Sequence, residues 1–102
     1  MKPSNDHEAI TLILEGLSQK GLTITEVMDD TWCPDERTVV TTVQDAIDLA
    51  CGVDEAYVYV LTPDDQNGWI RFVLGNDPEE VVCDHTVNLS EFIDPIVNPW
   101  WE

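Results

Sequence analysis

The chain has 102 residues, of which 21 are Asp or Glu and only four are Lys or Arg, so its formal charge at neutral pH is −17. Such a surface repels nucleic acids and anionic membranes, which argues against direct binding to either, and it attracts proteins whose own sites are basic. Hydrophobic residues make up 43% of the chain, close to the globular norm, so high charge alone does not make it disordered. We expect a single acidic domain over residues 1–102.

The cysteines and the apolar segments indicate the compartment. Cys33, Cys51 and Cys83 are an odd number without paired spacing, so a disulfide framework is not expected. No signal peptide is visible at the N-terminus, and no apolar run reaches the roughly 18 residues that a membrane span needs. The sequence therefore predicts a soluble, reduced, cytoplasmic protein.

The first predicted element is a helix near residues 6–20. Ile10, Ile13, Leu14 and Leu17 follow the i, i+3, i+4, i+7 spacing of a helix with one buried face. Its N-cap is expected within residues 4–6, and Gly21 is placed as the C′ glycine. Residues 22–27, rich in Thr and Ile, predict a strand, and a polar loop is expected over residues 29–37.

A second helix is predicted over residues 43–51, with Thr42 as its N-cap and Gly52 at its end. From Glu55 the period of apolar residues changes from 3.6 to 2. Residues 55–61, 69–74 and 81–83, separated by turns, then predict a three-stranded antiparallel meander, whose first strand we expect to be covered on both faces or nearly so. A short helix is expected from Ser90 until Pro95 ends it, followed by an irregular tail over residues 97–102.

This order of elements predicts an α+β fold with two layers. The helices should pack on one face of a small, mainly antiparallel sheet, made of the meander plus one or two further strands. The expected core residues are Ile13, Leu17, Ile47, Val58, Val60, Phe72 and Leu74.

Residues able to carry chemistry are few. Cys33, Cys83 and His85 are the candidates for a soft metal site, but the Cys-x₂₋₄-Cys pair that is typical of structural zinc is absent. A cysteine nucleophile is disfavoured, because acidic surroundings raise the pKa of a thiol. We therefore expect no enzymatic activity, no metal and no cofactor.

The acidic residues form the main pattern. From Thr42 onward there are thirteen of them and one basic residue, Arg71. Most lie in predicted turns, caps or outer helix faces, where Asp is ordinarily favoured, so solvated loops are one interpretation. The other interpretation is that the negative charge serves partner binding, because ordinary protein surfaces mix acidic with basic residues. The candidate binding carboxylates lie beside predicted rigid elements and are Asp45, Asp48, Asp54, Asp64, Asp65, Glu79 and Glu80.

The adjacent Trp100 and Trp101 are the second unusual feature. Two neighbouring Trp side chains cannot both point inward from a strand, so we expect at least one to be exposed or to cover a groove. A C-terminal lid packed on the sheet is the favoured interpretation. The alternative is an aromatic anchor for a partner, so both residues join the candidate binding residues.

Small size and extreme acidity together resemble the phage and plasmid proteins that imitate DNA. This resemblance implies a non-enzymatic inhibitor that occupies the basic groove of a nuclease, a restriction or CRISPR complex, or a DNA-binding protein. An immunity or antitoxin protein that masks a cationic toxin would have the same signature. A housekeeping domain adapted to high salt is the remaining alternative, in which the acidity serves solvation.

Overall fold

The computed structural model describes residues 2–29 and 37–101. The predicted loop over residues 29–37, which includes Cys33, lies outside them except for its two ends, and there the prediction is wrong, because Asp29 and Arg37 belong to strands. The elements in chain order are α1 (Asp6–Gln19), β1 (Thr23–Asp29), β2 (Arg37–Val39), α2 (Val43–Cys51), β3 (Glu55–Leu61), β4 (Asn67–Val73), the 3₁₀ turn η1 (Pro78–Glu80), β5 (Val82–His85), η2 (Val87–Leu89), α3 (Ser90–Val97) and η3 (Asn98–Trp101).

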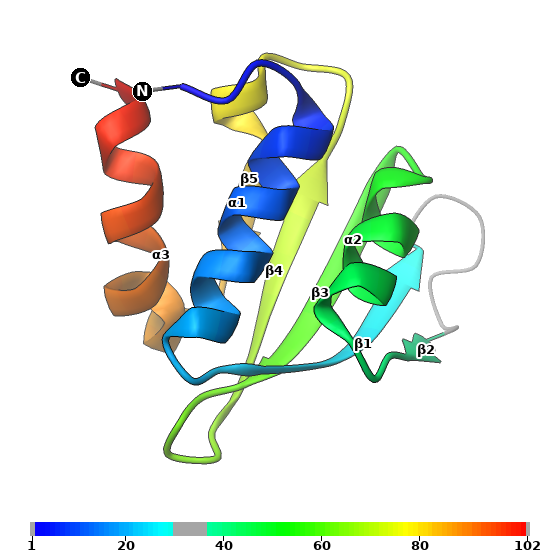
Figure 1. The fold of residues 1–102 in the computed structure, drawn as a ribbon, viewed down its shortest axis with the longest axis vertical. Helices are drawn as coiled ribbons and strands as arrows, with labels where there is room; N and C mark the ends of the chain where they lie inside the picture. The colour runs from blue at the N-terminus through cyan, green and yellow to red at the C-terminus, as the bar shows by residue number, and fades with distance from the viewer. Residues whose placement is uncertain (1, 30–36, 102) are drawn as a thin grey trace.

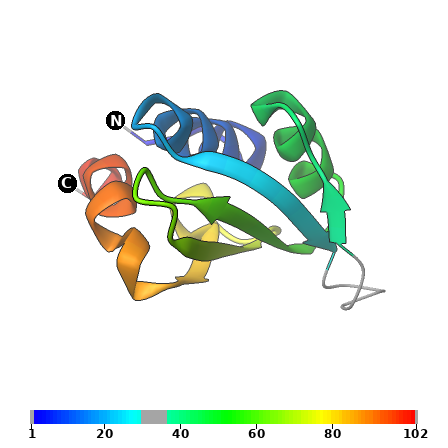
Figure 2. The same ribbon diagram turned by 90° about the horizontal axis from the view of Figure 1, so that it is seen from below.

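The five strands form one antiparallel sheet in the order β2-β1-β3-β4-β5, with β3 in the middle. Helices α1 and α2 lie side by side over one face, and α3 lies next to α1 at the β5 end (Figure 1). Figure 2 shows that no helix of the described ranges covers the other face. The predicted two-layer α+β fold is confirmed.

The ends of α1 follow the sequence signals. The side-chain oxygen of Asn5 accepts a hydrogen bond from the backbone N–H of Glu8 at 2.8 Å, which satisfies one of the free donors of the first turn. At the other end Gly21 has a φ of 93°, and the N–H of Leu22 bonds back to the carbonyl of Leu17 at 3.1 Å. Only glycine adopts this backbone conformation without strain, so Gly21 ends the helix as predicted.

The core lies between the helices and the sheet. Six of the seven predicted core residues are at most 1% exposed, namely Ile13, Leu17, Ile47, Val58, Val60 and Phe72. The prediction for Leu74 is wrong, because β4 ends at Val73 and Leu74 is only partly buried against the core. No helix of the described residues is long and apolar enough to cross a membrane.

The C-terminal region differs from the prediction. Helix α3 does not stop before Pro95 but continues to Val97, and the 3₁₀ turn η3 follows where an irregular tail was expected. Pro95 has no N–H for the carbonyl of Glu91, which disfavours a helix at this point. Burial of Ile93 and Trp100 in the core outweighs this loss.

Candidate partner-binding surfaces

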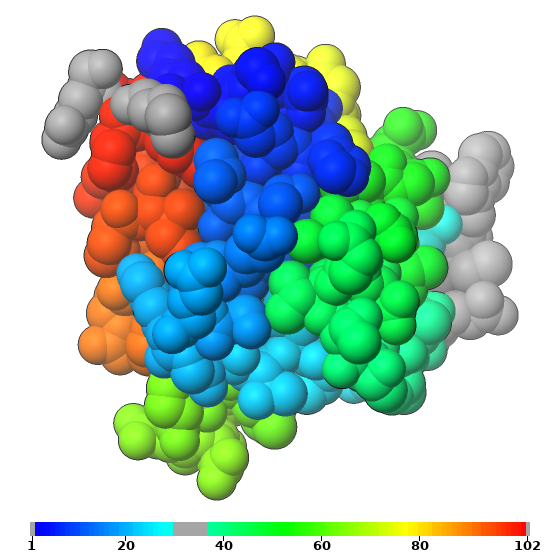
Figure 3. All heavy atoms as spheres, in the orientation of Figure 1, coloured from blue at the N-terminus to red at the C-terminus, as the bar shows by residue number. Residues whose placement is uncertain are grey.

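The three α-helices contain seven acidic residues and no Lys or Arg. No basic residue lies within the last turn of any of them, and only α1 has a cation at its C-terminal end, the C-cap residue Lys20. Their surfaces make up most of the face turned to the viewer in Figure 3. We call this set the acidic helical layer; its members are Asp6, Glu8, Glu15, Asp45, Asp48, Glu91 and Asp94.

Helix α2 holds two of the predicted binding carboxylates, Asp45 and Asp48, both exposed. The N–H of Asp45 donates to the hydroxyl of Thr42 at 3.1 Å, which fixes the start of the helix. The carboxylate of Asp48 accepts a hydrogen bond from the side chain of Gln44 at 2.9 Å. Asp54 is exposed in the turn that follows α2, and its carbonyl accepts the N–H of Leu74 at 2.9 Å. These carboxylates are therefore carried on ordered backbone.

The remaining predicted carboxylates lie at two ends of the molecule. Asp64 and Asp65 occupy the turn between β3 and β4, and Glu79 and Glu80 belong to η1 at the opposite end (Figure 1). The backbone of Asp65 has a φ of 62°, a conformation in which Asp is enriched among non-glycine residues. The predicted set thus does not form one patch but is spread over the longest dimension, 36 Å.

A groove beside β5 brings three of the predicted site residues together. This β5 groove has a volume of about 330 Å³ and is lined by Glu79, Glu80 and Trp101. Trp101 is 57% exposed, whereas Trp100 is 3% exposed and belongs to the core. The expectation that the two Trp side chains cannot both be buried is confirmed. Carboxylates that were not predicted as site residues also line the groove, Asp84 from β5 and Asp94 from α3.

The four basic residues of the chain all lie outside the three α-helices, although Lys20 follows α1 directly as its C-cap. Within the described ranges, Lys2 pairs with Glu79 at 3.7 Å, and Lys20 donates to the carbonyl of Phe92 at 3.0 Å. Both arginines of the chain, Arg37 and Arg71, lie on the sheet face that the helices leave uncovered. The acidity of the helical layer is therefore not balanced by cations of the helices themselves.

The uncovered side of the sheet, here the open sheet face, is aromatic. The ring centroids of Tyr57 and Trp69 are 5.3 Å apart in an edge-to-face arrangement, and those of Tyr57 and Tyr59 are 6.4 Å apart. The Arg37 guanidinium lies over the Tyr59 ring at 4.1 Å, and that of Arg71 lies 5.9 Å from the Tyr57 ring. Tyr57 and Tyr59 are only half-buried, so the expected cover on this face of the first meander strand is incomplete.

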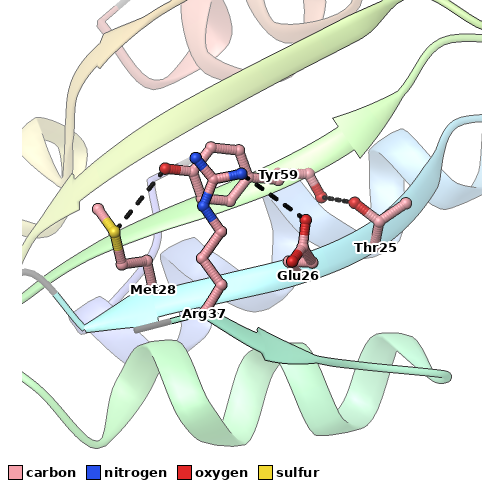
Figure 4. A network of polar contacts seen from close by, with 5 residues as sticks. All are labelled: Thr25, Glu26, Met28, Arg37 and Tyr59. Atoms are coloured by element: carbon pink, nitrogen blue, oxygen red, sulfur yellow. Dashed lines mark hydrogen bonds and ion pairs between the residues drawn. The ribbon is translucent and has the colours of Figure 1, made fainter. Parts of the chain in front are cut away.

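Figure 4 shows how Arg37 reaches from β2 across β1 to the ring of Tyr59. Its guanidinium pairs with Glu26 at 3.8 Å, and the Tyr59 hydroxyl lies 3.9 Å from the sulfur of Met28. On β4, Arg71 pairs more closely with Glu55, at 3.0 Å. A hollow of about 420 Å³ adjoins this network and is lined by Tyr59, Trp69 and Arg37, among others. The open sheet face therefore combines aromatic rings with paired charges of both signs.

The groups able to carry chemistry are dispersed. Burial raises the pKa of the Cys51 thiol, and the nearby carboxylates of Asp48 and Asp6 raise it further. A side-chain hydrogen bond to Glu55 raises the pKa of Arg71, so the guanidinium of Arg71 keeps its positive charge. In the described ranges no three His, Cys, Asp or Glu side chains gather closely enough to hold a metal ion. Cys33, one of the predicted metal candidates, lies outside these ranges.

The chain matches no protein-family model, and it shows no significant similarity to curated proteins or to solved structures. Its function is therefore inferred from the surfaces described above.

Proposed function

We propose that this protein is a non-enzymatic binding protein whose carboxylates occupy the basic, DNA-binding site of a partner protein. One observation carries the proposal: three helices present seven acidic residues and no basic one. Surfaces that serve solubility alone intersperse both signs, and basic residues at their C-terminal ends would stabilise α2 and α3, which have none. A surface that omits them keeps a strong negative potential at a cost in stability, which a basic partner offsets.

The dimensions suit a substitute for DNA. Predicted binding carboxylates lie at both ends of a molecule that is 36 Å long, which corresponds to roughly ten nucleotide steps of about 3.4 Å each. Asp45 and Asp48 lie on a helix and are held at fixed spacing. Partners of this kind include nucleases, restriction or CRISPR complexes and DNA-binding regulators, whose Lys and Arg side chains cannot serve DNA and this protein together.

A protein that masks a cationic toxin would use the same surface. The two functions differ in competition, because duplex DNA displaces a DNA mimic from its partner. We therefore propose to capture partners on the immobilised protein at about 50 mM salt and to elute them with duplex DNA. Affinity for the eluted partner should weaken at least about tenfold between about 50 and 200 mM salt.

A matched pair of variants locates the surface. D45N/D48N removes two charges from α2, whereas E26Q/E55Q removes two from the open sheet face. Because rim charges act mainly on the association rate, D45N/D48N should slow association by about two- to tenfold, and E26Q/E55Q should have a smaller effect. Equal effects, or no dependence on salt, would contradict the proposal. So would a protein that folds only in molar salt, which indicates high-salt adaptation.

A further inference from the structure

We propose that the open sheet face is a dimer interface, through which two copies of the chain pack about a two-fold axis parallel to β3. The residue types that meet on this face, Tyr, Trp, Met and Arg, are those enriched at protein interfaces. They are represented by Tyr57, Tyr59, Trp69 and Arg37, and by Met28, which is only 8% exposed and contacts the hydroxyl of Tyr59. This inference goes beyond the proposed function and does not depend on it.

The charges favour this face for self-association. Another copy is repelled by the acidic helical layer, because the helices carry no cation. On the open sheet face Arg37 is matched with Glu26 and Arg71 with Glu55. With Asp84, the described residues of each copy include two arginines and three carboxylates on this face. Two copies packed through it bring charges of both signs together and place their helical layers on opposite outer surfaces. Repulsion between the copies is lowest in this arrangement.

The strand register makes the face self-complementary. Cross-strand neighbours place Arg37, Met28, Tyr57, Arg71 and Asp84 in one row that runs across β2, β1, β3, β4 and β5. Directly paired residues share a face of the sheet. Because β3 is the middle strand, a two-fold axis along it sets Tyr57 against its own copy. The same rotation brings Arg37 of one copy to Asp84 of the other, and this contact occurs twice.

The next row gives the apolar part of the contact. It contains Val39, Glu26, Tyr59 and Trp69, and the N–H of Thr86 continues it by bonding to the carbonyl of Trp69 at 3.1 Å. Val39 is 73% exposed at one edge, and Val87, directly after Thr86, is 88% exposed at the other. The two-fold axis brings the Val39 edge of each copy over the Val87 edge of its partner. Two exposed apolar side chains thereby gain cover.

The area suffices for a reversible dimer. Three strands have seven residues, β2 has three and β5 has four, so at a spacing of about 4.8 Å the sheet spans roughly 450 Å² per copy. Two copies thus bury roughly 900 Å², the size of a weak, reversible interface. Twisted antiparallel sheets pack face to face about 10 Å apart, a layer that Tyr and Trp side chains fill. The Arg37–Glu26 pair, at 3.8 Å, is loose enough for Arg37 to exchange Glu26 for Asp84 of the partner.

Sedimentation velocity of the full chain, from about 1 to 500 μM at about 150 mM salt, tests the interface. The mass should rise from 11.5 kDa towards twice that value with increasing concentration. R37D and D84R should each weaken dimerisation at least about tenfold, because each sets like charges against each other. An equimolar mixture of the two variants should dimerise again, since both contacts in the mixed dimer then join Arg to Asp. The double variant R37D/D84R should also dimerise.

The control variant D45R has the same change in charge as D84R but lies on α2, and it should leave dimerisation unchanged. Recovery in the mixture shows that the single variants are folded. A chain that stays monomeric at every concentration would overturn the inference, as would single variants that dimerise like the parent or a mixture that fails to recover. A monomeric result leaves partner binding by the helical layer untouched, so the two proposals fail separately.

Discussion

The acidic helical layer and the open sheet face lie on opposite sides of one sheet, and they carry charge in different ways. The helices present carboxylates with no Lys or Arg among them, whereas the open face pairs each arginine of the chain with a glutamate beside an aromatic ring. A net charge of −17 therefore describes neither surface well. The difference teaches that two arginines, by their placement, give an acidic protein one surface of carboxylates without cations and one surface of paired charges.

The largest expected effect concerns the two sides of β4. Phe72 points into the core and is fully buried, whereas Trp69 is half-buried on the open sheet face. Phe72→Ala should lower the free energy of unfolding by about 3–5 kcal/mol. Trp69→Ala should cost about 1–2 kcal/mol, since it loses mainly its edge-to-face contact with Tyr57. Urea denaturation measures both, and equal losses would show that the open face is packed like the core.

Gly68 offers a second test of the side of the sheet that faces the core. A Cβ at this buried position would lie 2.9 Å from the side chain of Leu89, closer than real contacts allow. Gly68→Ala should therefore destabilise the fold by about 1–3 kcal/mol in urea denaturation. Gly16→Ala is the control: its Cβ meets only the flexible end of Ile96, and the helix gains up to about 1 kcal/mol. A neutral Gly68→Ala would mean that η2 packs loosely on the sheet.

A smaller effect separates repulsive from paired charges. E15Q/D48N removes two carboxylates of the helical layer and should raise stability by some tenths of a kcal/mol at about 10 mM salt, with the gain lost at about 500 mM. E26Q/E55Q removes the partners of Arg37 and Arg71 and should lower stability by about 0–1 kcal/mol. Thermal melts over a salt series give both values. Stabilisation by both variants would mean that the two surfaces do not differ electrostatically.

The smallest effect concerns Cys51. Its pKa is raised from 9.0 by burial and then by Asp48 and Asp6, so at pH 8 its thiolate fraction is low and a disulfide reagent should modify it more slowly than the exposed Cys83. The Cys51 thiol ionises at lower pH in the unfolded chain than in the folded protein. The contribution of the buried thiol to stability is therefore complete below about pH 9 and declines above it. Asp48→Asn in a C33S/C83S background should speed modification modestly. No change would assign the slow reaction to burial alone.

The sequence predicted elements wherever local periodicity and burial agree. The stripe of α1 and the cap at Thr42 were sufficient for two helices, and alternation was sufficient for β3 and β4. The three exposed residues of β2 show no such pattern, and this strand was not identified. The prediction ended α3 too early because Pro95 is a strong local signal for a helix end. The burial of Trp100, which stabilises the C-terminal turn, depends on packing between segments that are distant in the sequence. The prediction that Leu74 is buried failed for a related reason, since the alternation of apolar residues does not show where β4 ends.

The candidate surfaces were predictable only in part. Glu79, Glu80 and Trp101 were identified from the sequence, but their convergence in the β5 groove with Asp94 requires the placement of α3 next to β5. The alternation of Tyr57 and Tyr59 was visible, although which strand face stays uncovered is decided by where the helices pack. The Arg37–Asp84 relation depends on the register of five strands, which no local pattern encodes.

The placement of both arginines on the face opposite the helices also gives the described residues an electric dipole component across the shortest dimension of the molecule, 22 Å. In the field of a basic surface this dipole experiences a torque, so the protein rotates with its helices forward before any atoms touch. Fewer encounters then begin in a wrong orientation, and the rate of productive collision rises without any change in the contacts of the final complex.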